Sequence, residues 1–202
     1  MKSRVSVISA ITLLVRTGTM SASQHGNFSL RVDKDRMLLT PKGMSSLPEP
    51  EELALVDFAG IVEEGDVAPS IAEVVGMHAA VYRSRPDMTA VVHTHSPAAT
   101  AFALAHRALP CRYEGLLRSG QTRSVPVVPW ALRGSAGALE GISQTLAEDP
   151  DTRALLLANH GLLAFGPTPD AAALLVVALE EAARAELAAV ALGGAKDFAD
   201  HG

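Results

Sequence analysis

The segment of residues 90–95, which reads Ala-Val-Val-His-Thr-His, constrains the fold of this chain more than any other feature. Its apolar start favours a buried strand, and His93 and His95 follow at positions i and i+2. Side chains two residues apart on an extended segment lie on the same face, so both imidazoles can approach one metal ion. The segment therefore predicts a strand that carries two potential metal ligands at its end.

A third candidate ligand, His160, follows another apolar stretch, residues 154–158. Three neutral imidazoles that leave one coordination position open are typical of a catalytic zinc or similar divalent site. The alternative is a structural role for histidines at strand ends. Because Cys111 is the only cysteine, the metal ligands have to be nitrogen and oxygen atoms. We predict a metal site at His93, His95 and His160, with Zn²⁺ as the ion and Mn²⁺ as the alternative.

The composition indicates a folded protein of ordinary size. A hydrophobic content of 48% and a charged content of 19% exclude a disordered chain. We expect one domain over residues 1–202, because this length is enough to bury a single core. A net charge of −5 and the absence of a dense basic run give no support for nucleic-acid binding. The single cysteine is compatible with a reducing cytoplasm, where we expect the protein.

The N-terminal apolar segment, residues 5–15, allows two interpretations. Lys2 and Arg4 before it and the small residues 21–23 after it have the form of a secretory signal peptide. However, Arg16 ends the apolar run early, and the apolar residues recur at helical spacing. We therefore expect an amphipathic first helix. Elsewhere the sequence contains no apolar segment long enough to span a membrane, so we expect no membrane association.

Helical and extended patterns alternate along the rest of the chain. Strands are expected at residues 28–32, 36–40, 53–57, 60–62, 88–93, 154–158 and 162–165, the first two joined in a hairpin. Helices are expected at residues 72–83, 97–106, 136–147 and 169–192, and residues 109–129 are expected to be extended. The last helix carries an acidic face at Glu180 and Glu181. Hairpins mixed with helices predict an α/β (α+β) protein layered around one mainly antiparallel sheet.

Five short motifs, taken in order, resemble those of the class II aldolase/adducin family. They are Gly26-Asn27-Phe28-Ser29-Leu30-Arg31, Thr40-Pro41-Lys42-Gly43-Met44, Tyr82-Arg83-Ser84-Arg85-Pro86-Asp87, Ala90-Val91-Val92-His93-Thr94-His95-Ser96 and Asn159-His160-Gly161. The resemblance extends over residues 5–187. It implies a three-layer α/β/α fold with a central, mainly antiparallel sheet. It also implies a cyclic homotetramer with active sites at subunit interfaces, and a divalent metal ion held by three histidines.

The resemblance also implies an acid/base carboxylate, and Glu73 matches its position. A retro-aldol cleavage has to stabilise an enediolate, which a divalent ion does as a Lewis acid, and a base has to move a proton on carbon. In the aldolases the carboxylate precedes a helix histidine by four residues, whereas Glu73 precedes His78 by five. One residue rotates a helical side chain by about 100°. Either the helix starts differently, a bulge absorbs the residue, or Glu73 is not the base; we predict that it is.

Three further side chains have expected roles. Tyr113 matches a tyrosine that assists proton transfer across the subunit interface in the family, and a phenol is a suitable donor to a departing alkoxide. Its alternative role is that of a half-buried strand tyrosine. His78 and Tyr82 are expected in the core, with His78 hydrogen-bonded rather than bound to metal.

Glycine-containing turns supply the predicted phosphate site. In the sugar-phosphate members of the family, backbone amides and serines hold the phosphate, and glycine lets such amides converge on an anion. The matching residues are Gly26, Asn27, Thr40, Gly43 and Ser70, and Lys42 adds a cation nearby. A substrate with a carboxylate is the rival, and the turns also have a purely structural interpretation.

Three functional hypotheses follow. The first is a metal-dependent lyase, a class II aldolase acting on a small ketose phosphate with dihydroxyacetone phosphate or a similar donor. The second is a sugar-phosphate epimerase, dehydratase or decarboxylase that uses the same metal site. The third is a non-catalytic scaffold like adducin. The three intact histidines favour an enzyme, and we predict the aldolase.

Overall fold

An eight-stranded sheet forms the centre of the computed structural model, which describes residues 2–44 and 47–199. Its strand order is β4-β3-β2-β1-β5-β8-β7-β6, and every neighbouring pair is antiparallel except β6 and β7. The strands are β1 Gly26–Arg31, β2 Arg36–Leu39, β3 Ala54–Asp57, β4 Val62–Glu64, β5 Ala90–Thr94, β6 Val127–Val128, β7 Ala154–Leu157 and β8 Gly161–Gly166. The predicted mainly antiparallel sheet is confirmed.

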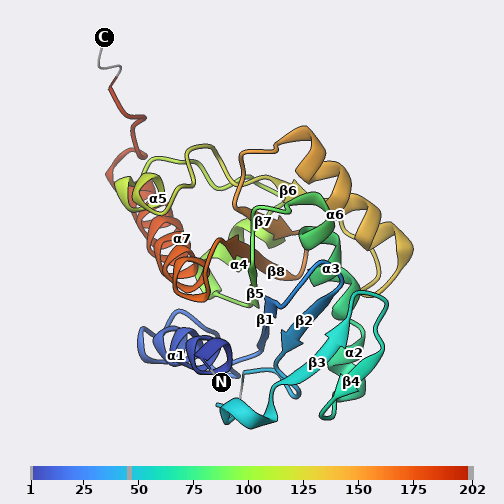
Figure 1. Cartoon of the computed structure of the whole chain (residues 1–202). Helices are drawn as coiled ribbons and strands as arrows, with labels where there is room; N and C mark the ends of the chain where they lie inside the picture. The colour runs from blue at the N-terminus through green and yellow to red at the C-terminus, as the bar shows by residue number, and fades with distance from the viewer. Residues whose placement is uncertain (1, 45–46, 200–202) are drawn as a thin grey trace.

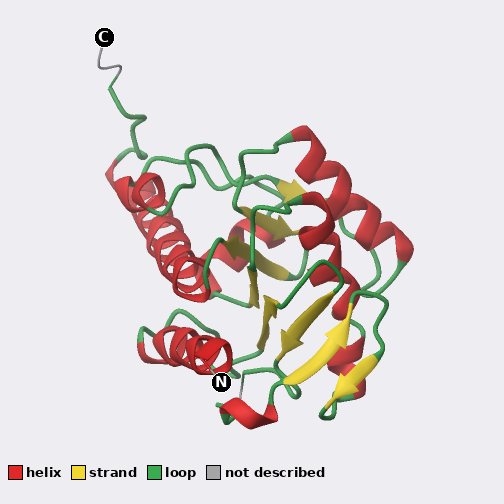
Figure 2. Ribbon diagram, in the orientation of Figure 1, coloured by secondary structure: helices red, strands yellow, loops and turns green. Residues whose placement is uncertain are grey.

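Helices cover both faces of this sheet (Figures 1 and 2). They are α1 Lys2–Arg16, α2 Pro69–Ala72, α3 Val75–Ser84, α4 Pro97–Leu104, α5 Glu114–Arg118, α6 Ala136–Glu148 and α7 Pro169–Ala189, with 3₁₀ turns at Pro50–Glu52 and Val190–Leu192. Helices α1, α4 and α7 pack on one face, and α2, α3 and α6 pack on the other. The three-layer α/β/α prediction is therefore confirmed. Within the described residues, no helix has the length and apolar character needed to cross a membrane.

Alternation along the central strands produces two apolar cores. Val92 of β5 belongs to the core beneath α1 and α7, whereas its neighbour Val91 faces the core beneath α3 and α6. Both are fully buried, which explains why β5 is apolar without interruption. Burying each such side chain contributes roughly 1.5–3 kcal/mol. Burial on both faces therefore stabilises the central strands.

The predicted helix over residues 72–83 is interrupted in the structure. Helix α2 ends at Ala72, Glu73 caps it, and α3 begins at Val75. The N–H groups of Glu73 and Val74 both bond back to the carbonyl of Ile71, which closes α2 with tight turns. Glu73 therefore lies in the break and not on α3, so its spacing of five residues from His78 does not run along one continuous helix. This corresponds to the explanation in which the helix starts differently.

Three other expectations need correction. The segment 109–129 is not extended throughout, because it contains α5 and β6, and the strand expected at residues 60–62 lies at Val62–Glu64. Glu180 is not on an exposed face, since it is only 1% exposed. Its carboxylate accepts the backbone N–H groups of Ala98 and Ala99, at 3.0–3.1 Å, in the first turn of α4. A helix N-terminus has unpaired N–H donors, so a buried carboxylate is stabilised there.

A buried hydrogen-bond relay connects α3 to β1. His78 is fully buried, and its Nε2–H donates to Asn27 Oδ1 at 2.5 Å. Its Nδ1 then accepts the hydroxyl of Ser29 at 2.6 Å, and Ser29 Oγ lies 2.8 Å from the Tyr82 hydroxyl. His78 and Tyr82 are thus core residues, as predicted. Because Asn27 Oδ1 is occupied by His78, the amide of Asn27 is held in one orientation.

The relay predicts that acid destabilises the fold. Burial lowers the pKa of His78 to about 3, below the value of about 6.5 for an unfolded histidine. The unfolded chain therefore binds the additional proton, so the stabilisation is complete above about pH 6.5 and is lost as the pH falls towards 3. In urea unfolding of the metal-free protein between pH 4.5 and 7.5, His78→Gln should reduce the slope of stability against pH by up to roughly 1.4 kcal/mol per unit below about pH 6.5, and leave it unchanged above. Equal slopes for the two proteins would contradict this.

Candidate metal centre

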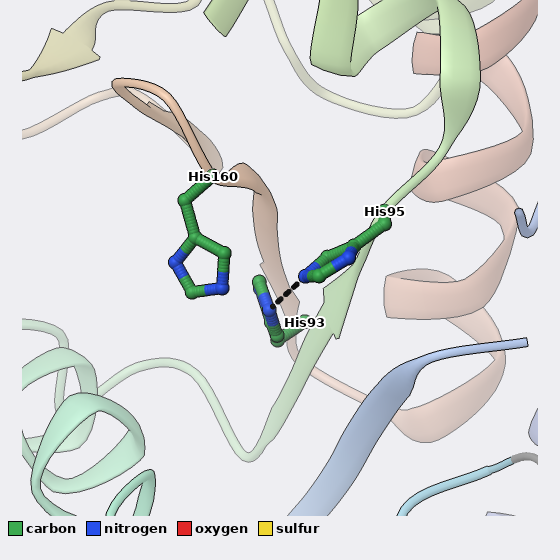
Figure 3. Close-up of side chains that lie close together, drawn as sticks. All are labelled: His93, His95 and His160. Carbon is green, nitrogen blue, oxygen red and sulfur yellow. Dashed lines mark hydrogen bonds between the residues drawn. The ribbon is translucent and has the colours of Figure 1, made fainter. Parts of the chain in front are cut away.

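Three histidines meet where β5 ends and β8 begins. Residue Thr94 of β5 pairs with Leu162 of β8, so His93, His95 and His160 lie at the same end of the two strands. Figure 3 shows the three rings pointing towards a common space. One nitrogen from each ring lies within 4.8 Å of the others, and the Nε2 atoms of His93 and His95 are 3.1 Å apart. The structure thus brings together all three predicted metal ligands.

The surroundings keep these imidazoles neutral. Burial lowers the pKa of His93 well below its ordinary range, with further contributions from His160 and His95. Burial is also the main reason why the pKa of His160 is lowered to about 4 and why that of His95 is lowered. Neutral imidazole is the form that binds metal ions. The Nδ1–H of His93 donates to the carbonyl of Leu162 at 3.0 Å, which leaves its Nε2 lone pair for a cation. The donor set fits a divalent metal ion.

Gly161 allows β8 to approach this close to the histidine pair. A Cβ atom there would lie 2.6 Å from the carbonyl oxygen of Thr94 and 2.9 Å from Cδ2 of His95. Before it, Asn159 adopts a positive φ of 57°, and its Oδ1 accepts the Nε2–H of His106 at 2.6 Å. The Asn-His-Gly sequence therefore combines a left-handed turn, a ligand and a close backbone approach.

A polar cavity of about 350 Å³ adjoins the three imidazoles. Four of the five predicted phosphate-binding residues line it together with Lys42: Gly26, Asn27, Gly43 and Ser70. A Cβ at position 26 would lie 2.5 Å from the carbonyl oxygen of His93, and Gly43 has a φ of 83°. Both turns therefore require glycine. The lining also includes His25, which the sequence reasoning missed, and its ring centroid lies 6.1 Å from that of His95.

The fifth residue, Thr40, lies outside the cavity wall. It is fully buried, and its hydroxyl accepts the backbone N–H of Phe28 at 3.1 Å. Its backbone N–H donates to the carbonyl of Phe28. Thr40 thus connects the segment after β2 to β1, and a direct contact with phosphate stays a prediction.

Glu73 lines a second, apolar cavity of about 280 Å³. This cavity shares Val74, Arg133 and His160 with the polar one, and its walls include Met77, Trp130, Leu132, Leu139 and Ile142. The Glu73 carboxylate forms an ion pair with Arg133 at 2.7 Å, and it is not among the groups that cluster with the three histidines. Arg133 was missed from sequence. The available signal was a lone arginine in an otherwise apolar loop, two residues before the helix-capping Ser135.

Tyr113 lies away from both cavities within its own chain. It is the N-cap residue of α5 rather than part of a strand, and its hydroxyl donates to Glu181 at 3.1 Å. This hydrogen bond is the main reason why the pKa of Tyr113 is raised. The structure therefore does not bring Tyr113 to the histidines of the same chain.

Comparison with known proteins identifies relatives of this chain by sequence. The sequence model for the family described as Class II Aldolase and Adducin N-terminal domain matches residues 6–187. The chain is 34% identical over 144 residues to a 5-methylthioribulose-1-phosphate/5-deoxyribulose-1-phosphate aldolase of Escherichia coli, covering 71% of this chain and 64% of that protein. It is 35% identical to an L-fuculose phosphate aldolase of Haemophilus influenzae, covering 73% of this chain and 65% of the relative. The chain thus spans slightly less than two thirds of these relatives.

Solved structures have the same fold over nearly the whole chain. An L-fuculose 1-phosphate aldolase superposes with a TM-score of 0.85 at 26% identity, covering 99% of this chain and 92% of that one. YgbL of Klebsiella pneumoniae, titled a putative aldolase/epimerase/decarboxylase, superposes with a TM-score of 0.78 at 28% identity. The two matched parts comprise 93% of this chain and 89% of YgbL.

The close approach at Gly161 predicts a sensitive position. Gly161→Ala should push β8 away from Thr94 and displace His95, because a methyl group has no space there. We expect a loss of roughly 1–3 kcal/mol in unfolding free energy and weaker zinc binding in a competition titration. The control is Gly137→Ala, on the exposed side of α6, where a Cβ meets nothing closer than 3.9 Å. Wild-type zinc affinity in Gly161→Ala would show that the contact does not matter.

Proposed function

Because the chain belongs to the class II aldolase/adducin family, we propose that it is a divalent-metal-dependent aldolase that reversibly cleaves a small ketose phosphate. The main support is the convergence of three neutral imidazoles beside a cavity lined by glycine turns and Lys42. The relatives named as fuculose-phosphate and methylthioribulose-phosphate aldolases favour a sugar phosphate as the substrate class. We further propose a single domain over residues 1–202, a cyclic homotetramer and a cytoplasmic location.

His93, His95 and His160 would hold the cation, with Zn²⁺ as the proposed ion and Mn²⁺ as the alternative. When bound, the ion supplies Lewis-acid chemistry, withdrawing the negative charge that develops on substrate oxygens during carbon–carbon cleavage. The carbonyl of Leu162 orients His93, and the fully buried backbone around Gly161 keeps the three rings in place.

The polar cavity would hold the phosphate group. Backbone N–H groups around Gly26 and Gly43 can converge on an anion, and Lys42 and Ser70 add a charge and a hydroxyl. Asn27 accepts the N–H of His78 through Oδ1, which leaves its amide N–H donors for a ligand oxygen. Thr40 supports these turns through its bonds to Phe28.

Proton transfer is assigned to Glu73 and Tyr113. In the direction of synthesis, Glu73 takes the carbon-bound proton of the donor substrate, and in cleavage it returns this proton. Tyr113 exchanges a proton with the aldehyde oxygen. Since Tyr113 lines neither the polar nor the apolar cavity of its own chain, the residue proposed to act in each site is Tyr113 of the partner subunit.

An epimerase, dehydratase or decarboxylase on the same metal site is the second candidate. The similarity to YgbL, which is described as an aldolase/epimerase/decarboxylase, supports this second candidate. Aldehyde release distinguishes the candidates, because only the aldolase produces an aldehyde from a ketose phosphate. The intact histidine cluster argues against an adducin-like scaffold without a metal site.

Loss of one imidazole should abolish metal retention. His95→Ala removes one of the three nitrogen ligands, and two remaining imidazoles bind a divalent ion far more weakly. We expect about one zinc or manganese per chain in the wild-type protein by mass spectrometry and almost none in the variant, with circular dichroism spectra that match. Full metal content in His95→Ala would show that the assigned ligands are wrong.

Loss of the base should separate metal binding from catalysis. Glu73→Gln keeps the size of the side chain but cannot accept a proton. We expect normal metal content, while exchange of the carbon-bound proton of dihydroxyacetone phosphate with deuterated water slows by about 100-fold or more. Exchange at the wild-type rate would transfer the role of base to another group.

A further inference from the structure

We infer that Arg133 is a positioning residue that aims the carboxylate of Glu73 for proton transfer. The inference rests on the proposed function, because it takes Glu73 as the base. It adds a side chain that neither the sequence motifs nor the histidine cluster indicated. Its evidence is the geometry of the ion pair and the way in which the backbone holds both partners.

Both contacts of the pair involve the same carboxylate oxygen. Arg133 donates from Nε at 3.0 Å and from Nη2 at 2.7 Å, in each case to Oε2 of Glu73. Among the described residues, Oε1 has no hydrogen-bond partner. Two N–H groups of one planar guanidinium converge on Oε2 and fix its position more firmly than a single N–H group would. One oxygen is therefore held while the other stays available for a proton.

The backbone on both sides of the pair is fixed. Glu73 occupies the break between α2 and α3, where its N–H bonds to Ile71. On the other side, the N–H of Ser135 bonds to the carbonyl of Leu132, and the hydroxyl of Ser135 caps α6. Gly134, between Arg133 and Ser135, has a φ of 75°, and a Cβ at this position would lie 3.6 Å from the carbonyl oxygen of Glu73. The loop thus places Arg133 against the break.

The location of the pair indicates catalysis rather than stability. The side chain of Glu73 is 54% exposed and that of Arg133 is 48% exposed. Ion pairs with that exposure contribute little to the stability of the fold. Arg133 nevertheless lines both cavities, as His160 does, and the Glu73 that it holds lines the apolar cavity. A substrate that extends from the polar cavity past the histidines has to meet Glu73 and Arg133 there.

The proton balance is simple. Oε1 of Glu73 accepts the carbon-bound proton of the donor, the C–H electron pair remains on the donor, and the carboxylate becomes a neutral carboxyl group. Arg133 keeps its charge throughout and continues to hold Oε2. In the cleavage direction the same oxygen returns the proton to carbon.

The test compares Arg133→Gln and Arg133→Lys with Arg36→Gln, a control that breaks another exposed ion pair, between Arg36 and Asp33. The probe is dihydroxyacetone phosphate, whose carbon-bound proton exchange with deuterated water is followed by NMR. For Arg133→Gln we expect kcat for exchange to fall about 10- to 100-fold, with KM changed less than about twofold. Metal content and the midpoint of thermal unfolding should match the wild type. For Arg133→Lys, kcat for exchange should lie between those of the wild type and Arg133→Gln. The lysine keeps the positive charge but lacks the two N–H groups of a planar guanidinium.

Chemical rescue provides a readout that a merely structural role does not produce. Guanidinium chloride at millimolar concentration should restore part of the exchange rate of Arg133→Ala but have no effect on Glu73→Ala. An unchanged kcat in Arg133→Gln, or a raised KM with normal kcat, would overturn the inference while leaving the aldolase proposal in place. Metal-loaded wild-type protein that exchanges no proton would overturn the proposed function and this inference with it.

Discussion

Antiparallel pairing of β5 with β8 is the constraint on which the candidate site depends. The register places Thr94 opposite Leu162, so the end of one strand lies beside the start of the other. Backbone hydrogen bonds hold that register, and the imidazoles of His93, His95 and His160 converge because each residue lies in a paired strand or one residue outside it. A slip by one residue would move the buried valines of β5 to the wrong faces, so the packing of both cores also protects the site.

Around this pair of strands, the same burial that stabilises the fold prepares the chemistry. Desolvation keeps the imidazoles neutral and ready for a cation, and it keeps His78 neutral in the relay that orients Asn27. The polar cavity on one side and the apolar cavity on the other share His160 and Arg133. A phosphate-bearing substrate bound in the first would therefore extend past the histidines towards Glu73, which agrees with the proposed aldol chemistry.

The positions that sequence reasoning found and missed differ in one physical respect. His93 and His95 were predictable because side chains two residues apart on a strand always share a face. The buried carboxylate of Glu180 was not, because it depends on hydrogen bonds to α4, 82 residues earlier in the chain. The interruption of the helix at Glu73 was missed because the tight turns back to Ile71 leave no trace in the apolar pattern. Arg133 was missed for a similar reason: its partner lies 60 residues away, and a single arginine carries no periodic signal.

By itself, the sequence determined the layered α/β architecture, the location of the strands that carry the histidines, and the glycines at the turns, because periodicity and backbone sterics act over a few residues. Only the tertiary structure decided that Thr40 is buried while Gly26 and Gly43 line a cavity, and that Arg133 holds Glu73. Those contacts are long-range, and they are set by strand register and helix packing rather than by local preference.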